Sequence, residues 1–143
     1  MPTVAEVQSA LRARAEANFT AAPLRFKNEG TALPVDGGGA PAGFVYVELL
    51  VENAGIVAFG GGRGSNLQRS IGRIEAHVLT PVGYGLDTGL GWAEQFCAVF
   101  RGQRVDNINY GAAEVFPQDG KTEDGSYAHI ATAIIDLSFD KAA

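Results

Sequence analysis

Apolar residues recur every three or four positions near the start of the chain, which predicts a helix. They lie at Val4, Val7, Leu11 and Ala15. Thr3 precedes them and Glu6 follows three residues later, which is the spacing of a capping box at a helix start. We expect this helix to end near Asn18.

A second helix is predicted in the middle of the chain. Asp87 or Thr88 can cap its start, and Gly102 can supply the left-handed residue that stops it. Its apolar stripe is wide, which indicates a helix clamped against a sheet. The stripe contains Leu90, Trp92, Ala93, Phe96, Cys97, Val99 and Phe100.

Alternation with a period of two predicts strands. Leu24–Lys27 is a short candidate, and Phe44–Val51 is apolar on both faces, as in a well-buried strand. Asn53–Gly55 can turn the chain into a further strand at Ile56–Phe59. Gln68–Thr80 alternates strictly, so one of its faces should pack and the other should be wet. The packed residues would be Ile74, Ala76 and Val78, and the wet ones Arg69, Ile71, Arg73, Glu75 and His77.

The last third of the chain predicts short strands near Arg104–Asn109 and Ala112–Phe116. An acidic loop at Pro117–Ser126 and a long closing strand at Tyr127–Phe139 follow. Helix, strands, helix and strands in this order predict an α+β fold, a mostly antiparallel sheet flanked by an N-terminal and a central helix. No composition shift divides the chain, so residues 1–143 are expected to form one domain.

Composition narrows the class of protein. The chain has 143 residues, 46% of them hydrophobic, which suits one folded domain. Its net charge of -5 argues against specific nucleic-acid binding. A single cysteine excludes an internal disulfide and a multi-cysteine zinc site. The start has no secretory signal pattern, and no stretch approaches the ~20 apolar residues that span a bilayer, so we expect no membrane partner.

No arrangement of residues predicts catalytic, cofactor-binding or metal-ligating chemistry. The 19 glycines cluster in loops, and Gly60–Asn66 invites a phosphate-binding interpretation. A strand follows that loop, however, where a phosphate cradle needs a helix N-terminus, so a flexible connection is favoured. His77 is expected to be a solvated surface residue and His129 a packing residue. Cys97 is expected to be a buried, unreactive thiol.

The order of these segments resembles the tail terminator (tail-completion) proteins of long-tailed phages, prophages and gene transfer agents. Four passages carry the resemblance after the N-terminal helix. They are Pro23–Glu29, with Phe26 where tryptophan is common, Phe44–Val47, Arg73–Gly85, which leads from a strand into the second helix, and Phe100–Gly102 at the end of that helix.

The resemblance implies a structural virion protein and no enzyme. Such proteins form a hexameric ring that caps the head-proximal end of the tail tube, ends tube polymerisation and offers a joining surface to the head. The implied partners are other copies of the chain, the tail tube protein and a head–tail connector, and DNA can pass through the ring. The implied location is the virion, after assembly in the cytoplasm of the bacterial host.

The pattern of the wet strand suggests which residues form the partner or lumen surface. We expect it to contain Arg63, Arg69, Arg73, Glu75 and His77. Two alternatives stay open: another head–tail connector or neck protein, and a small ligand-binding domain or enzyme that uses the Gly60–Asn66 loop.

Overall fold

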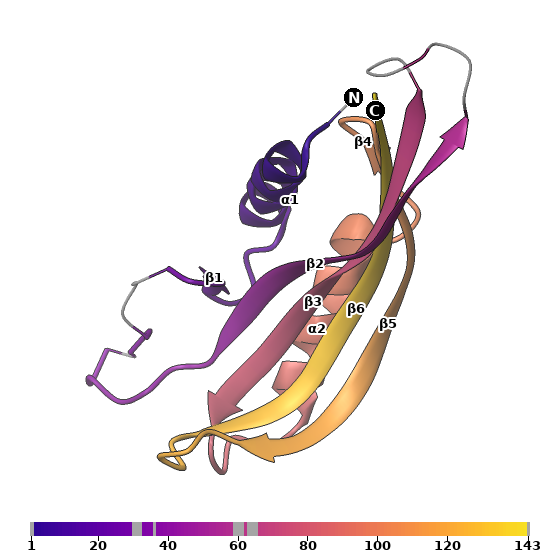
Figure 1. The fold of residues 1–143 in the computed structure, drawn as a ribbon. Coiled ribbons are helices and arrows are strands. Elements are labelled where there is room, and N and C mark those ends of the chain that lie inside the picture. Colours follow the sequence, from indigo (N-terminus) through magenta and orange to yellow (C-terminus); the bar gives the residue numbers. More distant parts are fainter. Residues whose placement is uncertain (1, 30–32, 36, 59–61, 63–65, 143) are drawn as a thin grey trace.

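A computed structural model describes residues 2–29, 33–35, 37–58, 62 and 66–142. Two helices and a six-stranded sheet make up this part of the chain (Figure 1). The sheet order is β1-β2-β3-β6-β5-β4, and every pair of neighbouring strands is antiparallel except β1 and β2. The elements are α1 (Val4–Asn18), β1 (Leu24–Phe26), β2 (Phe44–Ala58), β3 (Leu67–Pro81), α2 (Asp87–Phe100), β4 (Arg104–Val105), β5 (Ile108–Lys121) and β6 (Tyr127–Ala142). The predicted α+β class, an antiparallel sheet with two helices, is confirmed.

The first helix begins where its capping residue predicts. Thr3 has extended backbone dihedrals, and its hydroxyl accepts a hydrogen bond from the Glu6 N–H at 3.2 Å. Val7, Leu11 and Ala15 are fully buried, so the predicted stripe is the face that packs. The helix ends at Asn18, as expected.

The second helix begins without the predicted cap. Its N-cap is Leu86, which offers no side-chain oxygen, and Asp87 is already the first helical residue. The prediction that Asp87 or Thr88 caps the helix was therefore wrong. The predicted stop is correct, since Gly102 follows the C-cap with a φ of 68°.

The second strand is one long strand and not two. The predicted turn at Asn53–Gly55 was wrong because β2 continues to Ala58, paired with β3 throughout. A register shift between Val51 and Asn53 absorbs the irregularity that the asparagine and glycine signal. Beside it, Gly72 of β3 approaches so closely that a Cβ there would lie 2.2 Å from the carbonyl oxygen of Leu50.

The chain after α2 forms a tight hairpin. Asp106 and Asn107 both have positive φ, at 55° and 61°, and they connect β4 to β5 as a two-residue turn. The strand predicted over Arg104–Asn109 is therefore two strands. The acidic loop is also shorter than predicted, since β5 continues to Lys121 and only residues 122–126 connect it to β6.

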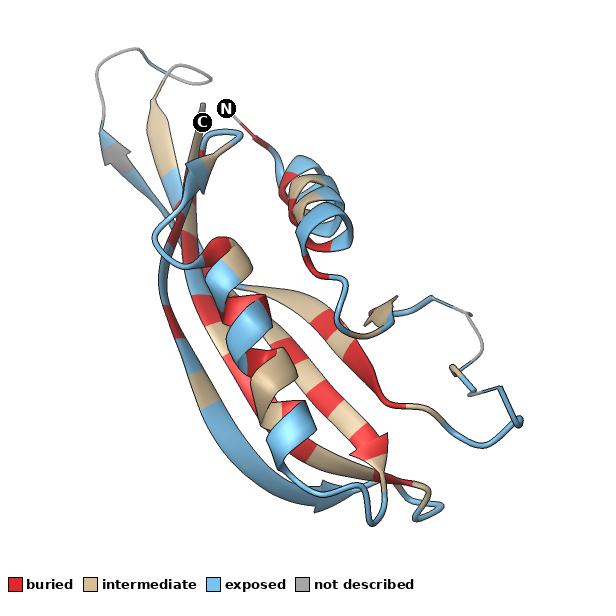
Figure 2. Cartoon of the chain, turned by 180° about the vertical axis from the view of Figure 1, so that it is seen from behind, coloured by how far each residue is buried: buried red, intermediate tan, exposed pale blue. Residues whose placement is uncertain are grey.

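Both helices lie on the same side of the sheet (Figure 2). The strand residues that point to them are buried, and they alternate with residues that are half-buried or exposed. Phe96 and Phe100 of α2 are fully buried, and Phe19, which follows α1, contacts Phe96 ring to ring at 5.5 Å. The hydrophobic core therefore occupies one face of the sheet only.

Candidate functional site

The opposite face of the sheet has no helix over it among the described residues (Figures 1 and 2). We call it the open face. Its side chains form rows across the strands, because directly paired residues point the same way. One row contains Tyr46, His77, Thr132 and Phe116, the next Glu48, Glu75, Ile134 and Glu114, and the third Leu50, Arg73 and Asp136.

Apolar side chains are present among the charges of the open face. Ile71 of β3 is 46% exposed and Phe116 of β5 is 47% exposed. Ile134 of β6 lies between its cross-strand partners, Glu75 of β3 and Glu114 of β5, and is half-buried. When another surface covers exposed apolar groups such as these, the free energy of the system falls, so association is favoured.

A chain of hydrogen bonds crosses three strands in the middle of this face. The Thr132 hydroxyl lies 3.1 Å from Nδ1 of His77 and 2.9 Å from Nε2 of His129. On the other side of its ring, His77 places Nε2 3.0 Å from a carboxylate oxygen of Glu48. The two imidazole rings meet edge to face at 5.2 Å.

A β-bulge explains why His129 and Thr132 can share one partner. Val78 pairs with Ala131 and Leu79 with His129, so Ile130 is an extra residue without a partner on β3. Ile130 is buried against Gly89 of α2, where a glycine Cβ would lie only 3.1 Å from it. The extra residue returns His129 to the open face.

Burial lowers the pKa of His129 from its ordinary value, and the electrostatic effect of the neighbouring His77 lowers it further. Both effects favour the neutral form of His129. A neutral imidazole has one N–H donor and one acceptor nitrogen, so His129 can donate to the Thr132 hydroxyl or accept from it.

Ion pairs surround the central cluster. Lys27 Nζ lies 3.6 Å from Glu48, and Arg73 contacts Glu52 and places Nε 3.7 Å from Glu75. Further along β3, Arg69 forms a two-pronged pair with Asp140 of β6, at 2.8 and 3.0 Å. These contacts pair Lys27 and both arginines of β3 within the chain.

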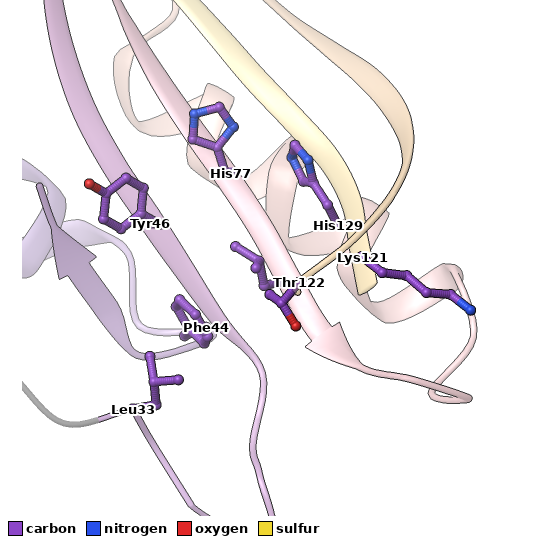
Figure 3. A pocket seen from close by; sticks show the side chains of 8 residues that line it. Leu33, Phe44, Tyr46, His77, Lys121, Thr122 and His129 are labelled. Atoms are coloured by element: carbon purple, nitrogen blue, oxygen red, sulfur yellow. The ribbon is translucent and has the colours of Figure 1, made fainter. Parts of the chain in front are cut away.

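A shallow pocket of about 420 Å³ lies beside the two histidines. Figure 3 shows Leu33, Phe44 and Tyr46 on one side of it and His77 and His129 on the other. Leu79, Lys121 and Thr122 complete the lining, and Lys121 extends away from the rest. The pocket is mostly apolar and open to solvent, so it can hold an apolar side chain from a neighbouring molecule.

The structure places four of the five predicted surface residues on the open face. Arg73, Glu75 and His77 lie together at its centre, and Arg69 lies further along β3. Arg63 and most of the Gly60–Asn66 loop lie outside the described residues. Whether this face meets a partner or lines a lumen stays a prediction.

Three members of the central cluster were missed by the sequence analysis. Glu48 belongs to a strand that the sequence analysis interpreted as buried on both faces. Its charged side chain next to the apolar Val47 was the signal that one face of this strand is polar. Thr132 and His129 are three residues apart, which without the bulge would put them on opposite faces. His77 is less solvated than expected, since hydrogen bonds hold both of its ring nitrogens.

Comparison with known proteins supports the fold. No family model and no curated protein sequence matches the chain. Among the solved structures that match the chain, one superposes with a TM-score of 0.54 at 15% sequence identity, over 95% of each chain. At this identity the likeness shows the fold alone. Within the described residues, no helix is long and apolar enough to cross a membrane.

Proposed function

We propose that this chain is the subunit of a tail-terminator ring, which caps the head-proximal end of a phage-type tail tube and offers the surface for head joining. The order of elements supports the proposal. A short helix, a short strand and two long strands precede the second helix, and a long strand closes the sheet. The resemblance in sequence implies this order.

The observation that carries the proposal is the open face. Ile71 and Phe116 are exposed on this face, and the half-buried Ile134 lies between their rows. Together with the charged side chains around them, they form a mixed apolar and charged surface that a neighbouring molecule can cover. The open pocket beside His77 and His129 lies on the same face. These features are those of a contact surface, and we assign it to a second copy of the chain.

Both arginines of β3 are paired within the chain, Arg69 with Asp140 and Arg73 with Glu52 and Glu75. The exposed apolar side chains would therefore carry the association, with the open face of one copy meeting a different surface of the next. Contacts of this head-to-tail kind close into a ring when the rotation between subunits allows it. Six such contacts acting together hold a tube end much more strongly than one.

The proposal is tested by deleting the gene from the genome that encodes it and measuring tails by electron microscopy. Tails longer than normal are expected, because nothing stops tube polymerisation. Tails of normal length that lack heads would instead assign the chain to the connector or neck proteins. Normal, infectious particles would refute both assignments.

A further inference from the structure

The open face also places three metal-ligating side chains together. One carboxylate oxygen each from Glu48 and Glu75 and one ring nitrogen of His77 all lie within 4.8 Å of one another. We propose that these three side chains form a binding site for a divalent transition-metal ion such as Zn²⁺. The proposal does not rest on the ring function, and it goes beyond the sequence analysis, which predicted no metal ligands.

The strands hold the three residues in a fixed arrangement. Glu48 of β2 and Glu75 of β3 are direct cross-strand partners, so their side chains start from neighbouring positions on one face. His77 follows Glu75 by two residues on the same strand, which gives it the same orientation. All three side chains are partly buried, with 18–22% of each exposed, so little conformational freedom is lost when an ion binds.

The distances are close to those of a filled site. Zinc binds imidazole nitrogen and carboxylate oxygen at about 2.0–2.2 Å, so ligand atoms around it lie roughly 3–3.5 Å apart. Nε2 of His77 and Oε1 of Glu48 are already 3.0 Å apart. The remaining ligand separations must shrink by no more than about 1–2 Å, which carboxylate rotamers can supply.

Thr132 prepares His77 for an ion. Metal-bound histidines usually donate their other ring N–H to an oxygen that fixes the ring, and here Nδ1 faces the Thr132 hydroxyl at 3.1 Å. Without an ion, every group is satisfied when His129 donates to Thr132, Thr132 to His77, and His77 to Glu48. With an ion on Nε2, His77 donates to Thr132 and Thr132 donates to His129. The hydroxyl both donates and accepts, so the chain reverses while its heavy atoms stay in place.

The donor set selects the class of metal. One imidazole with two carboxylates suits zinc, manganese, iron, cobalt or nickel, whereas Ca²⁺ and Mg²⁺ prefer oxygen ligands only. Lys27 and Arg73 balance the two carboxylates in the absence of an ion. Lys27 is 64% exposed and can swing into solvent when a cation takes its place.

The test uses isothermal titration of the full chain with Zn²⁺. We expect one ion per chain, with binding weakened at least tenfold in Glu75→Gln and in His77→Asn. The matched control is Glu114→Gln, a carboxylate of the same row of the open face, two strands away from Glu75, and it should bind as the wild type does. Thr132→Val should weaken binding by about 10–100-fold, and Thr132→Ser should restore it.

Two outcomes would overturn the site: no Zn²⁺ binding by the wild-type chain at 1 mM, or binding that Glu75→Gln and His77→Asn leave unchanged. Should a variant fail to fold, the imidazole NMR resonances of the wild type decide the matter. The His77 ring must shift on zinc addition more than the His129 ring does, and the opposite order refutes the site. All readouts use the free chain, so a failure to assemble rings does not affect them.

Discussion

His129 and Thr132 lie on the same face of β6 although they are three residues apart. A hydrogen bond of 2.9 Å joins the Thr132 hydroxyl to Nε2 of His129. The extra residue Ile130 makes this possible, since the bulge resets the alternation of the strand. One bulge thus does two things. It buries Ile130 against α2 on one face and assembles a polar cluster on the other.

The first prediction concerns the hydroxyl at the centre of this cluster. Thr132 is 97% buried, and Thr132→Val removes the shared partner of two histidine nitrogens. The free energy of unfolding should fall by about 1–3 kcal/mol, as expected for partly buried groups left without a hydrogen bond. Urea denaturation measures it. Thr132→Ser keeps the hydroxyl and should recover most of the loss, and equal losses in both variants would show that the methyl group matters instead.

The second prediction concerns the close approach of the β2 backbone to Gly72 of β3. At Gly72, a Cβ would lie 2.2 Å from the carbonyl oxygen of Leu50 and 3.1 Å from Cα of Val51, so Gly72→Ala must push β2 away from β3. We expect a loss of at least about 2 kcal/mol in thermal or urea unfolding. Gly55→Ala is the control, because it lies on the paired strand with open space around it, and its effect should stay within about 0.5 kcal/mol. A silent Gly72→Ala would contradict the close strand approach.

The third prediction concerns acid stability. Hydrogen bonds from Arg69 hold the pKa of Asp140 below its ordinary value. Burial opposes this, and the charges of Arg69 and Arg104 lower the pKa further. A carboxyl group with a lowered folded pKa stabilises the fold above its unfolded pKa of about 3.9, and this stability disappears as the pH falls through the folded pKa.

In urea denaturation between pH 2.5 and 6, Asp140→Asn should therefore lower stability at pH 6. The loss should be about 0.2–1 kcal/mol, because the pair is partly exposed. The variant should also lose less stability than the wild type as the pH falls below 4. A variant with the wild-type pH profile would show that the pair contributes nothing.

The fourth prediction concerns the single thiol. Burial raises the pKa of Cys97 to about 11. Its side chain is fully buried on the face of α2 that packs into the hydrophobic core. Because the thiolate is the reactive form, a disulfide reagent at pH 8 should label the native chain slowly and the urea-unfolded chain within minutes. Rapid labelling in native buffer would mean that α2 detaches readily from the sheet.

Much of the fold is visible in the sequence because local chemistry and tertiary packing agree there. Thr3 caps α1, Gly102 stops α2, and the strict alternation of Gln68–Thr80 gives the two faces of β3 correctly. These signals are short-range and were predictable. The fold class followed from their order.

The errors have a common physical origin in irregular strands. Asn53–Gly55 has the composition of a turn, but pairing with β3 keeps the strand going and a register shift absorbs the mismatch. Asp106 and Asn107 form the turn that the prediction placed inside a strand. Of the open face, the β3 residues were predictable from alternation. The place of His129 depended on a bulge whose extra residue, Ile130, packs against Gly89 of α2, far away in the sequence.

The central claim is that the chain acts by associating with copies of itself through the open face. The mass of its assemblies tests this most directly, measured by native mass spectrometry on the purified chain and on the chain released from particles. We expect a sixfold ring in particles, its loss in Phe116→Asp and Ile71→Asp, and a normal ring in Val82→Asp, a similarly exposed residue off the sheet. Circular dichroism should show all three variants folded. A monomer absent from every particle, or open-face variants that assemble as well as the wild type, would contradict the account.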